Sequence, residues 1–99
     1  MADDEPEDRQ ARRLLIEGRV QGVGYRDWMV ATARRLGLHG WVRNRADGCV
    51  EALVAGPSTA IEALVEACRK GPPAARVNAI NATPADHPGH TGFHRAPTC

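Results

Sequence analysis

The stretch from Gly18 to Arg26 combines the residue types that an anion site needs. It contains Gly22 and Gly24 shortly before an arginine. Glycine lets the backbone curve so that successive N–H groups can point at one oxyanion, and the first amides of a helix lack internal partners and carry partial positive charge. Arg26 adds a charged planar fork that can take two phosphate oxygens. The stretch therefore suggests a small phosphate or carboxylate site, although such a turn taken alone more often has a structural role.

Two familiar nucleotide-binding loops do not fit this stretch. A Walker-type loop requires a lysine directly after its last glycine, whereas Gly24 is followed by Tyr25. The dinucleotide pattern G-x-G-x-x-G also fails, because Asp27 stands where the third glycine is required. The expected ligand is therefore a small anion rather than a nucleotide.

The spacing of apolar residues predicts the elements that position this loop. Apolar residues alternate in the expected strands and recur every three or four positions in the expected helices. In order, we expect a strand at 12–20, a helix at 25–36, a strand at 38–45, a strand around 50–54, a helix that opens at 56–59 and ends at 71–73, and a strand at 76–81. This order fits a split β-α-β domain of the α+β class, an antiparallel sheet with two helices on one face.

Three local signals refine this arrangement. The turn residues 46–48, Ala-Asp-Gly, predict a hairpin between the second and third strands. Thr59 and Glu62 fit a capping box at the start of the second helix. The spacing of three between Val77 and Ile80 indicates a bulge in the fourth strand.

Length and composition indicate one small globular domain. The chain has 99 residues, of which 42% are hydrophobic and 25% charged, so there is room for one modest core. Residues 1–11 are rich in acids and poor in large apolar side chains, so we expect a disordered acidic tail before a domain at 12–99. The sequence has no run of eighteen apolar residues and no basic, apolar leader, so we expect no membrane span and a cytoplasmic location.

The net charge and the cysteine content argue against nucleic-acid binding, zinc sites and a disulfide framework. The formal net charge of +1 gives no bulk electrostatic case for nucleic acid, and the three cysteines form no CxxC pair that would suggest zinc or a disulfide framework. His87, His90 and His94 could be drawn with Cys99 as a metal cluster. They lie in a loop-like segment that no matching ligand set frames, so we interpret them as solvated histidines.

Two motifs closely resemble those of the acylphosphatase family. The first is Gly18–Arg26, and the second runs from Gly40 to Glu51 with the sequence GWVRNRADGCVE. The likeness extends from about Leu14 to Ile80, and two separate motifs in the correct order with a helix between them make it specific. The fold of that family, a ferredoxin-like β-α-β-β-α-β sandwich, agrees with the order of elements expected from periodicity.

The resemblance implies roles for individual residues. It makes Arg26 the phosphate-binding arginine and Asn44 the residue that holds the attacking water. It also makes the preceding loop a cradle whose backbone amides hold the phosphoryl oxygens: Gln21, Gly22, Val23, Gly24 and Tyr25. Without Arg26, we would interpret Asn44 as a polar residue at a strand end beside a turn.

The activity that the resemblance implies is hydrolysis of the carboxyl–phosphate bond of small acyl phosphates. The leaving carboxylate is already a stable anion, so positioning and charge stabilisation suffice without a strong general acid. We therefore expect an acyl phosphate substrate, inorganic phosphate as product or inhibitor, no metal, no cofactor, no nucleic-acid or membrane partner, and a monomer. The alternative is a non-catalytic phosphate- or anion-sensing module, or an RNA-binding module, on the same fold. An RNA reader should expose aromatics on adjacent central strands, where the hairpin offers only Trp41.

The end of the chain departs from the family pattern. Family members usually alternate two apolar residues in the last strand, whereas here Phe93 is followed two positions later by Arg95. We therefore expect any fifth strand to be short. Asp27, directly after Arg26, is expected either to hold that arginine by an ion pair or to favour the start of the helix.

Overall fold

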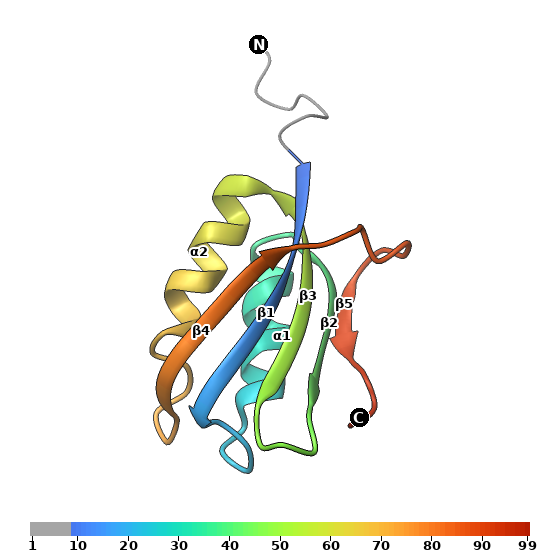
Figure 1. Cartoon of the computed structure of the whole chain (residues 1–99). Helices are drawn as coiled ribbons and strands as arrows, with labels where there is room; N and C mark the ends of the chain where they lie inside the picture. The colour runs from blue at the N-terminus through green and yellow to red at the C-terminus, as the bar shows by residue number, and fades with distance from the viewer. Residues whose placement is uncertain (1–8) are drawn as a thin grey trace.

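The computed structural model describes residues 9–99 and places two helices on one face of a sheet (Figure 1). The six predicted elements occur in the predicted order, followed by a short fifth strand. Within the described residues the elements are β1 (Arg9–Arg19), α1 (Tyr25–Arg35), β2 (His39–Asn44), β3 (Val50–Pro57), α2 (Ser58–Cys68), β4 (Arg76–Pro84) and β5 (Phe93–Arg95). The fold is therefore α+β, as the order of elements predicted, and it has the ferredoxin-like arrangement that the family resemblance implied.

The sheet has the strand order β4-β1-β3-β2-β5. The first four strands pair antiparallel, as predicted. The fifth strand, whose direction the sequence did not predict, runs parallel to β2, so the five-stranded sheet is mixed. The chain leaves β4 at one edge and crosses to the opposite edge before β5 begins (Figure 1), so it enters β5 in the direction of β2. β4 runs opposite to β2, so a strand that returns through the sheet after β4 runs parallel to β2.

The core lies between the sheet and the two helices. Alternate residues of the strands face the helices, and the apolar stripes predicted for both helices are buried against them. The fully buried side chains include Leu14, Ile16, Val42, Val50 and Val54 from the sheet and Met29, Ala33, Ile61, Leu64 and Cys68 from the helices. This core fixes the direction in which α1 leaves the loop that follows β1.

The outer face of the sheet carries an ion-pair cluster around Glu51. Although Glu51 is only 3% exposed, its carboxylate accepts hydrogen bonds from Arg13 and Arg43. Burial alone would raise the pKa of Glu51, but the two arginines outweigh burial and hold it below its ordinary value. The Arg43 guanidinium also lies 4.6 Å from the centre of the Trp41 ring, so this outer-face aromatic is engaged by a neighbouring side chain.

Two element boundaries differ from those expected. β1 begins at Arg9 rather than near residue 12, because β3 extends to Pro57 and residues 9–11 pair with its last three residues. Residues 1–8 of the expected tail lie outside the described part of the chain. The same extension of β3 makes Pro57 the residue that precedes α2, so Thr59 is already helical and the predicted capping box with Glu62 is wrong.

The bulge predicted in β4 is confirmed. Glu17 lies opposite Ala79 whereas Gly18 lies opposite Val77, so Asn78 is the extra residue. Gly18 adopts a φ of +132°, and a β-carbon there would lie 2.1 Å from a carbonyl oxygen of β4. Only glycine fits this close approach, which lies just before β1 ends and the loop begins.

Candidate functional site

A small hollow opens where β1 ends, α1 begins and β2 ends. Its volume of about 70 Å³ is far below the roughly 300–1,000 Å³ of sites for drug-sized ligands, so it suits a group of only a few atoms. In Figure 1 the loop after β1 and the turn between β2 and β3 lie at this same end of the sheet. The residues that line the hollow are Val20, Gly22, Gly24, Tyr25, Arg26, Asp27, Asn44 and Arg95.

The loop between β1 and α1 presents its backbone to the hollow. Gly22 and Gly24 adopt φ values of +74° and +81°, in the left-handed region that other residues rarely enter. Among the backbone hydrogen bonds outside regular elements in residues 9–99, none is donated by residues 22–26. The N–H groups of this loop and of the first turn of α1 therefore remain available to an anion, at the positive end of the helix dipole.

Arg26 is the second residue of α1 and is partly buried at the wall of the hollow. Within residues 9–99 its guanidinium forms no ion pair, because the neighbouring Asp27 instead binds Arg95, with 2.8 Å between Oδ1 and Nη1. The suggested ion pair between Asp27 and Arg26 is therefore not formed. The charge of Arg26 remains available to a ligand.

Asn44 is the last residue of β2, and its side chain is not used by the fold. Its Oδ1 atom is buried and has no hydrogen-bond partner among the described residues. The adjacent turn is held instead by Asp47, whose Oδ1 accepts a hydrogen bond of 3.0 Å from the Cys49 amide. That bond, with Arg45 adding to it, holds the pKa of Asp47 below its usual range. A structural role in the turn therefore does not explain why residue 44 is an asparagine.

Gln21 links the loop to the turn that follows Asn44. Its Nε2 atom donates hydrogen bonds to the carbonyl oxygens of Arg45, at 2.8 Å, and Cys49, at 2.9 Å. This bracing fixes the glycine loop relative to the end of β2. Because the two acceptors lie 24 and 28 residues along the chain, sequence spacing did not predict the role.

The side chain of Tyr25 is committed to the core rather than to the hollow. Its hydroxyl donates a 2.6 Å hydrogen bond to the carbonyl oxygen of Cys68, the last residue of α2, and its ring packs edge-on against Trp28. Burial raises the pKa of Tyr25 well above its ordinary value and the pKa of the Cys68 thiol to about 12. Tyr25 therefore anchors the first turn of α1 to the end of α2, and its backbone N–H is the part left for a ligand.

Comparison with known proteins agrees with this geometry. The acylphosphatase family model matches residues 12–95, which is most of the chain. The chain belongs to the acylphosphatase family. An acylphosphatase from Acidiphilium cryptum is 59% identical over 88 residues, which cover 89% of this chain and 97% of that protein. These findings support acylphosphatase activity and do not favour a sensing or RNA-binding module.

Solved acylphosphatase structures share the fold. The crystal structure of an acylphosphatase from Bacillus subtilis superposes with a TM-score of 0.84 at 40% identity, covering 87% of this chain and 97% of that one. An acylphosphatase from Coxiella burnetii gives a TM-score of 0.88 at 30% identity, covering 97% of this chain and all of that one. The family and the ferredoxin-like fold expected from the sequence are thus confirmed.

The hollow contains five of the seven residues that the resemblance to acylphosphatases singled out. Gly22, Gly24, Tyr25, Arg26 and Asn44 line it. The other two, Gln21 and Val23, do not: the first braces the loop through its side chain, and the second packs against the core.

Arg95 also lines the hollow, and sequence reasoning did not assign it a role. It is the last residue of β5, where it lies opposite Val42 of β2. Because Val42 is buried beneath the helices, Arg95 shares the helix-bearing face with Val42 and with Asn44 two residues further along β2. The signal in the sequence was its position in the last strand, where acylphosphatases usually carry an apolar residue.

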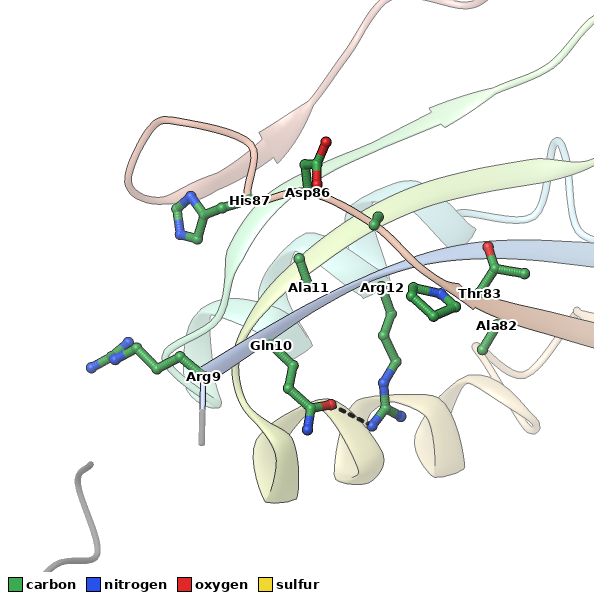
Figure 2. Close-up of a pocket in the computed structure, with 10 residues that line it drawn as sticks. Arg9, Gln10, Ala11, Arg12, Ala82, Thr83, Asp86 and His87 are labelled. Carbon is green, nitrogen blue, oxygen red and sulfur yellow. Dashed lines mark hydrogen bonds between the residues drawn. The ribbon is translucent and has the colours of Figure 1, made fainter. Parts of the chain in front are cut away.

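A larger hollow lies at the opposite end of the sheet (Figure 2), with a volume of about 710 Å³. It is lined by the start of β1 and the end of β4, residues 9–12 and 82–87. Figure 2 shows the Arg12 guanidinium turned toward Gln10, whose Oε1 accepts a 2.7 Å hydrogen bond. No residue of the two acylphosphatase motifs lines this hollow, so it is not the candidate active site.

His87, His90, His94, Cys99 and Trp41 do not line the small hollow. Within residues 9–99, no group of three or more histidine, cysteine or acidic residues is placed to hold a metal ion. The rings of His90 and His94 lie against each other, with their centres 4.6 Å apart. None of the described helices has the length and apolar character needed to cross a membrane.

Proposed function

We propose that this chain hydrolyses small acyl phosphates by attack of a water held by Asn44 on a phosphoryl group bound by Arg26 and the loop amides. The observation that carries the proposal is that these groups line one hollow of about 70 Å³ although they come from different elements. Within residues 9–99, Arg26 has no ion-pair partner, the loop N–H groups are unused and Oδ1 of Asn44 has no hydrogen-bond partner. Together in one small space, these groups match what a phosphoryl group and a water require.

The proposed division of work follows from the chemistry of the bond. Negative charge lies on the three outer oxygens of the phosphoryl group during transfer, and Arg26 with the N-terminal amides of α1 supplies the opposing positive charge. Asn44 orients the water so that it attacks in line with the departing carboxylate. The carboxylate leaves without protonation because it is a stable anion at neutral pH.

The remaining expectations belong to the same proposal. The positive charge supplied by Arg26 and the helix terminus takes the place that a metal ion has in many phosphoryl-transfer sites, so we propose turnover without a metal. We further propose that the enzyme acts as a monomer in the cytoplasm, with inorganic phosphate as product and inhibitor and without a nucleic-acid or membrane partner. Size-exclusion chromatography with light scattering tests the monomer.

The decisive experiment follows the hydrolysis of benzoyl phosphate by ultraviolet absorbance in the presence of EDTA. Wild-type enzyme should turn over, while Arg26→Ala and Asn44→Ala should each lose about 100- to 1,000-fold in kcat, by comparison with the loss of one oxyanion-hole donor. Arg12→Gln removes an equal charge at the far end of the sheet and should retain wild-type activity. Loss of wild-type activity in EDTA, or full activity in either site variant, would contradict the proposal.

A further inference from the structure

The small hollow contains a second arginine that the proposed mechanism does not use. Arg95 comes from β5, far from the β1–α1 loop in the sequence, and lines the hollow together with Arg26 and Asn44. Its position is fixed by the backbone: β5 pairs with β2 so that Arg95 lies opposite Val42, and the next amide, of Ala96, donates a 2.8 Å hydrogen bond to the Val42 carbonyl. The side chain therefore starts from an anchored strand.

The Arg95 side chain is also held at its charged end. Its Nη1 atom lies 2.8 Å from Oδ1 of Asp27, in the first turn of α1. A guanidinium carries five N–H donors, so one such contact leaves several donors free. The Arg95 side chain is 47% exposed, so the pair with Asp27 is not itself a large source of stability.

The pairing of Arg95 with Asp27 affects how the hollow can bind an anion. Asp27 favours the start of α1, but its negative charge at the wall of the hollow opposes a phosphate. Arg95 neutralises that charge and adds further N–H donors at the wall of the hollow. A hollow of about 70 Å³ is small enough that a group seated in it lies close to the residues that line it.

We propose that Arg95 is a second phosphoryl-binding arginine, held at the hollow by Asp27. This inference rests on the proposed function of the same site and assigns it a further substrate-binding residue. A phosphoryl group is held by Arg26 and the loop amides and, in addition, by the Arg95 guanidinium, which reaches the hollow from β5. Because the contact forms with substrate, transition state and inorganic phosphate alike, Arg95 acts on binding and has little effect on the chemical step.

The first test compares Arg95→Gln with wild type using benzoyl phosphate as substrate and inorganic phosphate as competitive inhibitor. A hydrogen bond to a charged group that is partly exposed to solvent predicts that KM and the inhibition constant for phosphate each rise about tenfold, while kcat stays within about threefold. Arg12→Gln, with the same change in net charge, should leave both constants unchanged. Unchanged constants in Arg95→Gln would overturn the inference.

The second test separates direct binding from simple neutralisation of Asp27. The double variant Asp27→Asn/Arg95→Gln removes both partners and keeps the net charge of wild type. If Arg95 binds the phosphoryl group, the double variant binds phosphate more weakly than wild type does. If Arg95 only neutralises Asp27, the double variant regains the wild-type affinity, and the inference is wrong. Circular dichroism and urea unfolding establish that each variant is folded.

Phosphate affinity measured by titration calorimetry keeps this inference distinguishable from the proposed function. A wild-type protein that binds phosphate without hydrolysing benzoyl phosphate would defeat the proposed enzyme mechanism while leaving the role of Arg95 open to the same titration. A wild-type protein that hydrolyses benzoyl phosphate, with Arg95→Gln binding phosphate equally well, would defeat this inference alone.

Discussion

Replacing Asn44 with leucine should separate the activity of this protein from its stability. Leucine has the same branched shape as asparagine but no polar atoms. In the wild type, Oδ1 of Asn44 is buried and has no hydrogen-bond partner in the part of the chain that the structure describes. A buried polar group left unpaired costs about 1–3 kcal/mol of folding free energy. Because Asn44→Leu removes that cost without opening a cavity, we expect the free energy of unfolding to stay unchanged or to rise by about 1 kcal/mol.

The two quantities can be measured independently on the same sample. A gain of about 1 kcal/mol in a domain of this size raises Tm by about 4–8 °C. Urea unfolding followed by the fluorescence of Trp28 and Trp41 gives the free energy, provided that the m-value is unchanged. In Asn44→Leu, kcat for benzoyl phosphate should be about 100- to 1,000-fold lower than in wild type, because the attacking water loses the group that positions it.

One outcome would refute this reasoning. If Asn44→Leu lowers the free energy of unfolding by more than about 1 kcal/mol, the asparagine side chain has a structural role at the end of the strand. The loss of activity would then reflect a damaged fold and not the loss of a water-positioning group. Asn81→Leu serves as the control, because Asn81 is an exposed strand asparagine outside the hollow. It should leave kcat unchanged.

Three further predictions concern the scaffold of the site. Tyr25→Phe removes the hydroxyl that donates a hydrogen bond to Cys68 but keeps the backbone amide of residue 25. The free energy of unfolding, measured in urea, should fall by about 1–2 kcal/mol, while kcat should change by less than about threefold. A loss of activity beyond about tenfold in the folded variant would refute the anchoring role. Glu51, whose folded pKa is lowered, stabilises the fold above its unfolded pKa, about 4.3, and this contribution is lost as pH falls through the folded value. Urea midpoints between pH 3 and 7 should therefore fall with acid in wild type and less steeply in Glu51→Gln; equal slopes would contradict the assignment. Gly40→Ala places a β-carbon 1.8 Å from a β3 carbonyl oxygen, so it should lower the free energy of unfolding by about 3 kcal/mol or more. In Gly48→Ala the added β-carbon meets nothing within 4 Å, so the loss should be only about 1 kcal/mol. Comparable urea midpoints for the two variants would show that the close approach at residue 40 relaxes.

Most of the fold could be predicted because it depends on local patterns. Apolar spacing at Leu14 and Ile16, and at Ile61 and Leu64, marks which face of each element is buried, and these faces are buried in the structure. The irregular spacing in β4 predicted a bulge for the same reason. The predicted capping box is absent because the start of α2 is not set by local residues alone. The pairing of β3 with β1 extends that strand to Pro57, so α2 begins at Ser58 and Thr59 lies inside the helix.

In the candidate site, too, some features follow from local sequence and others depend on the tertiary structure. The sequence by itself determined that residues 18–26 form a glycine-rich turn before a helix, with an arginine in its first turn, because backbone freedom and helix polarity are local properties. Whether Asn44 reaches that turn depends on the sheet order, which places the end of β2 beside it.

Arg95 depends still more on the tertiary structure. Nothing local specifies that β5 crosses to the edge beside β2, and an arginine in place of an apolar residue predicts only a weak strand. Local sequence sets the shape of each element and the face that it buries. Residues 26, 44 and 95 line one hollow only when all the strands have their final neighbours, and the packing of the whole sheet against its helices determines those neighbours.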